Sequence, residues 1–123
     1  MSAVPIITET KIYIPRAISR RTCYANEYII VLEKRSVMLK EKQRIRKFSA
    51  TKKPQVIDKT PEMRYLVHVY TTTRGNVYIT VYDLLENKQI VEVSTLMPLK
   101  SILSKISQLP EYVKKIVSDE LFY

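Results

Sequence analysis

The sequence predicts an α+β fold in which a small, β-rich basic module is followed by a β-β-β-α-α unit. Several runs within the first 94 residues alternate apolar and polar side chains with the period of a strand. After Pro98 the apolar residues recur at helical spacing instead. Positive charge is concentrated at one end, because residues 1–62 carry 14 Lys and Arg against 6 Asp and Glu, whereas residues 63–123 carry 7 against 6. This asymmetry indicates two parts with different tasks.

The expected boundary lies at residues 49–62, which contain two prolines and few apolar side chains. Such a segment is typical of a linker or an exposed loop. We therefore expect residues 1–48 to form a basic nucleic-acid-binding module. Residues 63–123 are expected to form a unit that dimerises or meets a partner.

The first element is predicted as a strand over Ile6–Ile14, where isoleucine and threonine side chains share one face at period two. Pro15 ends this strand because it cannot donate a hydrogen bond to a sheet ladder. Since proline suits the first turn of a helix, Arg16–Arg21 is expected to form one or two helical turns.

Residues 26–48 have two interpretations. In the first, Tyr28–Glu33 and Val37–Lys40 form a strand hairpin; in the second, one helix spans the whole stretch. The β-branched cluster Ile29-Ile30-Val31 favours strands. The run from Val37 to Lys47, rich in Lys, Arg, Glu and Gln, favours the helix. We favour the hairpin and keep the helix as the alternative.

The second half contains three predicted strands and two predicted helices. Tyr65–Thr71 and Val77–Leu84 are joined by a turn in which Gly75 supplies a positive φ angle. Gln89–Ser94 follows a turn at residues 86–88. Pro98 and Pro110 begin and interrupt the helical pattern, whose apolar stripes are Leu99, Ile102, Leu103 and Ile106, then Val113, Ile116, Val117 and Leu121.

The composition excludes several classes of protein. A single cysteine, Cys23, rules out an intramolecular disulfide and a multi-cysteine metal site. Because Gly75 is the only glycine, the chain has no glycine-rich phosphate loop. No apolar run approaches the roughly 18 residues that span a bilayer, and no signal peptide opens the chain, so we expect a cytoplasmic protein. Abundant Ile, Val, Tyr, Lys and Arg are typical of heat-adapted archaeal proteins.

No catalytic site, metal site or cofactor is predicted. General acid–base catalysis needs a positioned pair of groups, and the single histidine, His68, has no carboxylate or nucleophile near it in the sequence. The Asp and Glu residues are scattered singly, so they form no metal-ligand set. We expect a protein that is not an enzyme and has no small-molecule substrate.

The basic residues of the first half carry the functional signal. Neutralisation of phosphates by Lys and Arg supplies most of the sequence-independent affinity of proteins for DNA. Arginine also makes bidentate contacts to phosphate or guanine, which lysine makes poorly. The predicted nucleic-acid-binding residues are Arg16, Arg20, Arg21, Lys34, Arg35, Lys40, Lys42, Arg44, Arg46 and Lys47. The alternative is a solvated basic surface without a specific partner.

A short pattern runs through residues 6–40. It consists of Ile6-Ile-Thr-Glu-Thr-Lys-Ile-Tyr-Ile-Pro15, Ile18, Arg20-Arg21-Thr22, Tyr24, Asn26-Glu27, Ile30, Leu32 and Val37-Met-Leu-Lys40. This pattern resembles the SpoVT/AbrB family of swapped-hairpin DNA-binding domains. The resemblance implies an obligate dimer whose interleaved hairpins form one barrel. It also implies that Lys11, Arg16, Arg20 and Arg21 contact DNA.

These observations predict a homodimeric DNA-binding protein, a transcription regulator that grips duplex DNA through its basic first half and has no membrane partner. A second hypothesis is an RNA-binding or ribonucleoprotein component that uses the basic run 40–53 and stacks bases on tyrosines. The tyrosines that would form such a platform are Tyr65, Tyr70, Tyr78 and Tyr82. A third hypothesis is a protein-interaction module of a virus or a toxin–antitoxin system.

Overall fold

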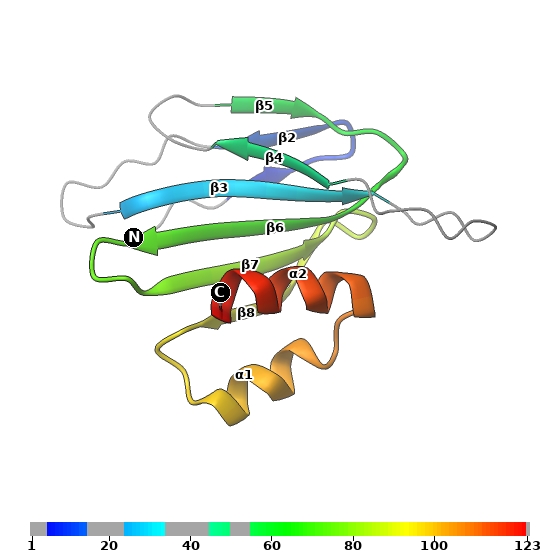
Figure 1. Ribbon diagram of the computed structural model, residues 1–123. Helices are drawn as coiled ribbons and strands as arrows, with labels where there is room; N and C mark the ends of the chain where they lie inside the picture. Colours follow the sequence, from blue (N-terminus) through cyan, green and yellow to red (C-terminus); the bar gives the residue numbers. More distant parts are fainter. Residues whose placement is uncertain (1–4, 15–23, 34–44, 50–54, 123) are drawn as a thin grey trace.

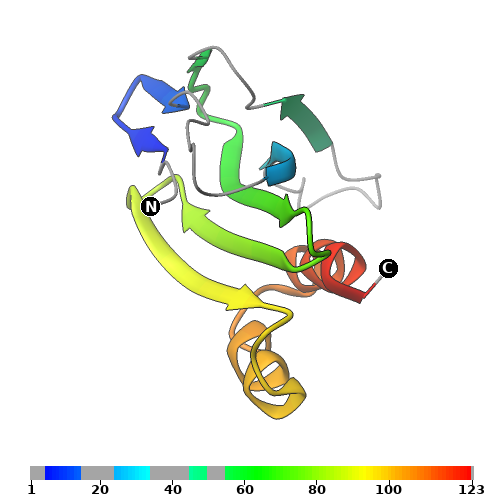
Figure 2. The same ribbon diagram turned by 90° about the vertical axis from the view of Figure 1, so that its left-hand side faces the viewer.

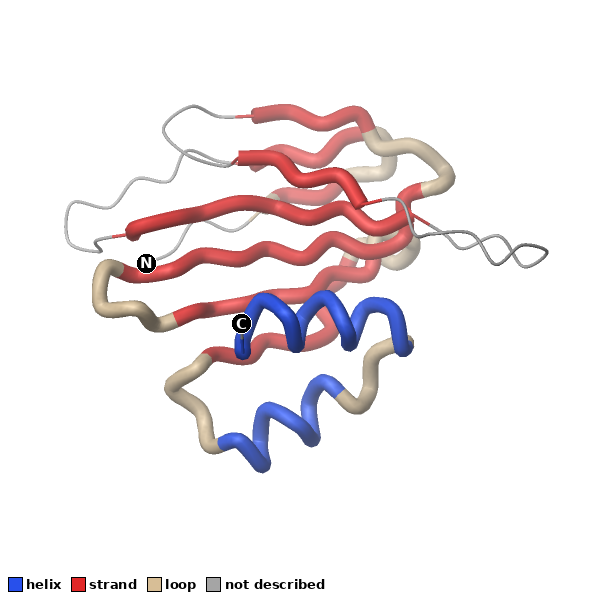
Figure 3. Tube along the Cα trace, viewed as in Figure 1, coloured by secondary structure: helices blue, strands red, loops and turns tan. Residues whose placement is uncertain are grey.

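The computed structural model describes residues 5–14, 24–33, 45–49 and 55–122 of the chain. In these residues, strands form two sheets and two helices pack against the larger sheet (Figures 1 and 3). Strands dominate the structure. The expected α+β class is therefore confirmed in its broad form.

A five-stranded antiparallel sheet is the centre of the fold. Its strands, in spatial order, are β4 (Ile45–Ser49), β3 (Tyr24–Glu33), β6 (Met63–Thr72), β7 (Val77–Asp83) and β8 (Lys88–Ser94). A small sheet covers one of its faces and consists of β1 (Ile6–Ile7), β2 (Lys11–Ile14) and β5 (Gln55–Asp58). Helices α1 (Leu99–Ile106) and α2 (Glu111–Phe122) cover the opposite face (Figure 2).

The two turns that connect the last three strands lie where the sequence predicts them. Gly75 has a φ of 90°, and its N–H donates to the carbonyl of Thr72 at 3.0 Å. Asn87 has a φ of 54°, a conformation that asparagine tolerates better than most residues. The Asp83 side chain supports this second turn, since its Oδ1 accepts a hydrogen bond from the N–H of Leu85 at 2.8 Å.

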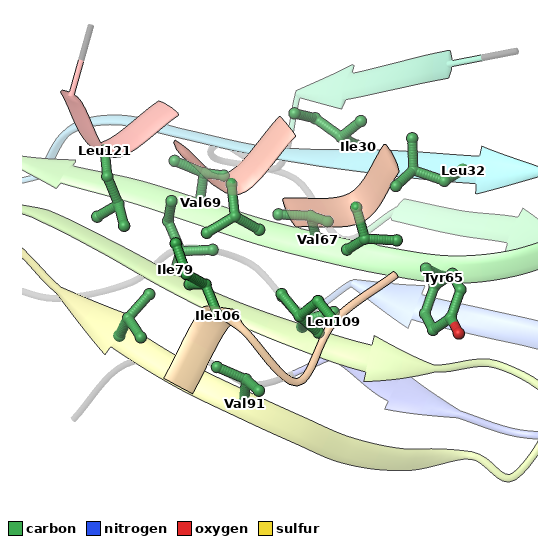
Figure 4. Close-up of a cluster of buried hydrophobic side chains, with 14 of the residues drawn as sticks. Ile30, Leu32, Tyr65, Val67, Val69, Ile79, Val91, Ile106, Leu109 and Leu121 are labelled. Atoms are coloured by element: carbon green, nitrogen blue, oxygen red, sulfur yellow. The ribbon is translucent and has the colours of Figure 1, made fainter. Parts of the chain in front are cut away.

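The helices bury most of their predicted stripes against the large sheet. The resulting helix-side core, shown in part in Figure 4, contains Ile30, Leu32, Tyr65, Val67, Val69, Ile79, Val81, Val91, Val93, Ile102, Ile106, Leu109, Val113, Val117 and Leu121. Leu99 and Leu103 of α1 are exceptions, because both are exposed. Helical spacing placed them in the stripe, but α1 lies at the β8 margin of the sheet, where only Ile102 and Ile106 face inward.

The small sheet encloses a second core between itself and the large sheet. This small-sheet core contains Ile12, Ile29, Val31, Ile57, Met63, Leu66, Tyr82 and Leu84. The single strand expected over Ile6–Ile14 is wrong, because this stretch folds back on itself as β1 and β2. The Thr8 hydroxyl fixes the turn by accepting from the Lys11 N–H at 3.0 Å. A period-two pattern does not reveal such a fold-back, since the alternation continues on both sides of the turn.

The structure supports the strand interpretation of Tyr28–Glu33, which lies within β3. The alternative helix is wrong for the described residues of this stretch, because residues 45–48 are also in a strand. β4 is one neighbour of β3 in the sheet, while the predicted partner strand, Val37–Lys40, lies outside the described residues.

The expected order, a basic module followed by a separate unit, is not confirmed. β3 pairs with β6 from Tyr24 to Glu33, so strands from both halves share one sheet. Residues 49–62, expected as a linker or loop, contain β5, which pairs with β2. These pairings join residues at least 30 positions apart, and local composition carries no signal for them.

Candidate functional site

Two of the predicted nucleic-acid-binding side chains are described, and they lie on different sheets. Lys11 of β2 is exposed, and its Nζ is 2.8 Å from Oδ1 of Asp58 on β5. This hydrogen bond raises the pKa of Lys11 and lowers the pKa of the Asp58 carboxyl group. The carboxylate offsets the positive charge of Lys11, which weakens the role that the family resemblance gives to this residue.

Lys47 is exposed on the edge strand β4, where its ammonium group lies over an aromatic ring. Its Nζ is 3.9 Å from the ring centroid of Tyr28 on β3, a cation–π contact. The Tyr28 hydroxyl donates a hydrogen bond to Glu120 of α2, and burial raises the pKa of that carboxyl group. No acidic partner of Lys47 is found among the described residues, so its charge faces solvent.

The other predicted contacts lie outside the described side chains. For Arg46 only the backbone, within β4, is described. The remaining eight are Arg16, Arg20, Arg21, Lys34, Arg35, Lys40, Lys42 and Arg44. They belong to residues 15–23 and 34–44, which connect β2 to β3 and β3 to β4.

Net charge is divided unevenly between the described residues and residues 15–23, 34–44 and 50–54. The described residues carry eleven Lys and Arg and eleven Asp and Glu, and so have no formal net charge. All other residues together carry ten Lys and Arg and one Glu, which accounts for the whole +9.

These basic segments are attached at the two ends of the strands. Residues 15–23 and 50–54 connect strand ends that lie at one end of the molecule, where β2 and β4 finish and β3 and β5 begin (Figure 1). Residues 34–44 connect the end of β3 to the start of β4 at the opposite end (Figure 1).

A buried polar pair on the small-sheet face of the large sheet is the feature that the sequence did not reveal. His68 of β6 and Glu27 of β3 are only 3% and 4% exposed, and His68 Nε2 lies 2.6 Å from Glu27 Oε2. The sequence shows no carboxylate partner close to His68 along the chain, because Glu27 is 41 residues away. The strand predicted from the sequence begins at Tyr28, so Glu27 lies just before it, and no local signal places this glutamate in the sheet.

The surroundings of this pair indicate a structural role. The His68 ring lies 5.8 Å from the ring of Tyr70, which in turn stacks on Tyr78 at 4.9 Å between centroids. Within the described part of the chain, Glu27 Oε1 has no hydrogen-bond partner. General acid–base chemistry needs a group that reaches its substrate, and this pair is almost completely shielded from solvent. The pair holds β3 against β6.

The tyrosine platform of the alternative RNA-binding hypothesis does not form one surface. Tyr65 packs in the helix-side core and Tyr82 in the small-sheet core, and both are buried. Tyr70 and Tyr78 are half-buried and stack on each other. Alternation of side chains across the sheet puts Tyr65 on the opposite face from the other three.

The described residues contain neither a metal-binding cluster nor a membrane-spanning helix. No three His, Cys, Asp or Glu side chains among them are placed to hold a metal ion. No described helix is long and apolar enough to cross a membrane. The chain matches no known family model, no curated protein and no solved structure.

Proposed function

We propose that this chain is a non-enzymatic nucleic-acid-binding protein that grips duplex DNA as a dimeric transcription regulator. The observation that carries the proposal is the segregation of charge: the described residues have no formal net charge, and residues 15–23, 34–44 and 50–54 hold the entire +9. Clustered Lys and Arg on a neutral scaffold are the electrostatic footprint of a polyanion-binding protein. The SpoVT/AbrB resemblance points to the same class of function, but the proposal does not depend on it.

The spacing of the two basic ends is compatible with a duplex. β3 has ten residues, so its ends are separated by about 30 Å. One turn of B-DNA is about 34 Å long, and a phosphate backbone therefore returns to the same face of the duplex at nearly this interval. Basic segments at the two ends of the strands would meet the same DNA backbone one turn apart.

A salt titration with duplexes of two lengths tests the proposal. We expect affinity for a duplex of about 16 base pairs to fall roughly a thousandfold between about 50 mM and about 200 mM salt, as for contacts with about six phosphates. A duplex of about 6 base pairs spans only half a turn and should bind much more weakly. Salt-insensitive or absent binding would contradict the proposal, and tighter binding of single-stranded RNA would replace DNA by the RNA alternative.

Matched charge variants locate the contact. Arg20→Ala together with Arg21→Ala should lower the salt slope by about 2 and weaken binding to all sequences. Lys100→Ala together with Lys115→Ala removes the same charge from exposed positions of α1 and α2. If the helix variant weakens binding as much as the arginine variant, DNA is held by the net charge of the protein and not by the connecting segments.

A further inference from the structure

β8 is an edge strand of the large sheet, and part of its backbone faces outward. The N–H of Thr95 donates to the carbonyl of Val77 at 3.0 Å, in register with the β7–β8 ladder. Because hydrogen-bonded and non-hydrogen-bonded pairs alternate in antiparallel strands, Val93 and Val91 also bond to β7. The backbone groups of Glu92 and Ser94 point away from β7. Among the described residues, the Glu92 N–H, the Glu92 carbonyl and the Ser94 N–H have no partner on this side.

A groove runs along this edge. It has a volume of about 420 Å³ and is lined by residues 89–94 of β8, with Met97, Lys105 and Gln108 on the α1 side and Tyr78 behind. A free strand edge is complementary to another extended backbone, which can return its alternating donors and acceptors. The groove is therefore suited to an extended strand.

Three exposed leucines follow the same strand in the chain. Leu96, Leu99 and Leu103 are 63%, 58% and 51% exposed, and they lie on the connection after β8 and on α1. They make up three of the nine large apolar side chains that are exposed in the described part of the chain. Leu99 and Leu103 are four residues apart, so they share one face of α1. Apolar side chains gathered in this way are typical of an interaction surface.

We propose that the occupant is a second copy of this chain, which pairs its β8 antiparallel with this β8 about a two-fold axis through Val93. In this register, Glu92 of each copy faces Ser94 of the other. The Glu92 N–H, the Glu92 carbonyl and the Ser94 N–H are the outward groups without a described partner, and the Ser94 carbonyl, which accepts from the Met97 N–H at 3.1 Å, would accept a second hydrogen bond. A register centred on Glu92 would place two carboxylates opposite each other, which is destabilising. This inference rests on the dimeric state in the proposed function and assigns the surface that forms the dimer.

A second copy satisfies both features of this surface in one operation. A two-fold axis through β8 brings α1 of each copy toward α1 of the other, because an isologous interface uses the same elements on both sides. The exposed leucines of the two helices would then be covered while the sheet becomes continuous. A lone extended peptide would cover the backbone edge but leave Leu99 and Leu103 in water. The other edge of the sheet, β4, carries Arg46 and Lys47, whose charges oppose self-pairing.

The oligomeric state in the absence of DNA tests the inference. We expect sedimentation equilibrium to show a dimer, with Glu92→Pro weakening it at least about tenfold, because proline removes one outward N–H without touching the β7–β8 ladder. Leu99→Glu together with Leu103→Glu should weaken the dimer by a similar or larger factor. Val56→Glu on β5 is the matched control, since Val56 is equally exposed, at 53%, but lies on the small sheet. It should leave the dimer intact.

Circular dichroism of each variant keeps the outcome interpretable. Val91→Pro should unfold the sheet because its N–H points toward β7, whereas Glu92→Pro should keep the native spectrum. A monomeric wild-type protein, or a dimer that survives both edge variants, would overturn the assignment. These measurements are made without DNA. A result that contradicts the β8 dimer therefore leaves the DNA-binding proposal to be judged separately, by the salt titration.

Discussion

The two faces of the large sheet are built from the same strands but bury different kinds of side chain. The helix-covered face buries aliphatic side chains and Tyr65 from β3, β6, β7, β8 and the helical region that follows. The small-sheet face buries aliphatic side chains together with Glu27, His68 and Thr80. Apolar packing tolerates many arrangements, whereas buried polar groups require a specific partner. The helix face therefore provides bulk stability, and the small-sheet face fixes the alignment of β3 with β6.

The largest effect is expected from breaking the buried pair. His68→Ala leaves the Glu27 carboxylate buried with neither oxygen hydrogen-bonded, since Oε1 already has no partner. Removing one member of a buried pair typically costs about 3–5 kcal/mol. Urea unfolding followed by circular dichroism should show this loss in the free energy of unfolding.

A matched substitution separates the hydrogen bond from the charge. Glu27→Gln keeps an oxygen that accepts from His68, so it should cost about 1 kcal/mol or less. Replacing both residues by leucine should restore most of the stability that His68→Ala loses. If His68→Ala costs no more than an ordinary surface substitution, the pair does not fix the alignment of β3 and β6.

The helix face should respond to loss of volume instead of loss of a partner. Ile79 of β7 is fully buried in the helix-side core. Ile79→Ala removes buried methylene and methyl groups and leaves a cavity, which typically costs about 2–5 kcal/mol, and we expect about 3 kcal/mol. Ile79→Val should cost only about 1 kcal/mol, measured by the same urea unfolding. A polar replacement of equal size that costs no more than Ile79→Val would contradict the purely apolar character of this face.

The contrast between the faces also explains how much the sequence reveals. Strands β6, β7 and β8, both turns and both helices follow from local signals, because proline, glycine and side-chain periodicity act over a few residues. The small-sheet face depends on contacts between β2 and β5 and between β3 and β6, which join distant residues. Periodicity gives no information on such pairings. For this reason the sequence predicts a boundary at residues 49–62 and reveals no partner for His68.

The two candidate interaction surfaces also differ in how far the sequence reveals them. The basic character of the first half is visible in composition alone, and the structure adds only where its segments attach. The β8 edge is not visible in the sequence, because Leu99 and Leu103 have the spacing of a buried stripe and their exposure depends on where α1 sits. Helical spacing identifies an apolar face but not what covers it.

The smallest effect concerns Tyr82, a member of the small-sheet core. Burial, with a smaller contribution from Glu92, raises the pKa of Tyr82 to about 12. A tyrosine in the unfolded chain ionises near pH 10, so this stabilisation is fully present below about pH 10 and is lost as the pH rises through about 12. Between about pH 9 and about pH 11 the wild-type protein should lose roughly 1 kcal/mol more than Tyr82→Phe, after allowance for screening by water. Urea unfolding of both proteins at the two pH values measures the difference, and equal losses would show that Tyr82 is as well solvated in the folded protein as in the unfolded chain.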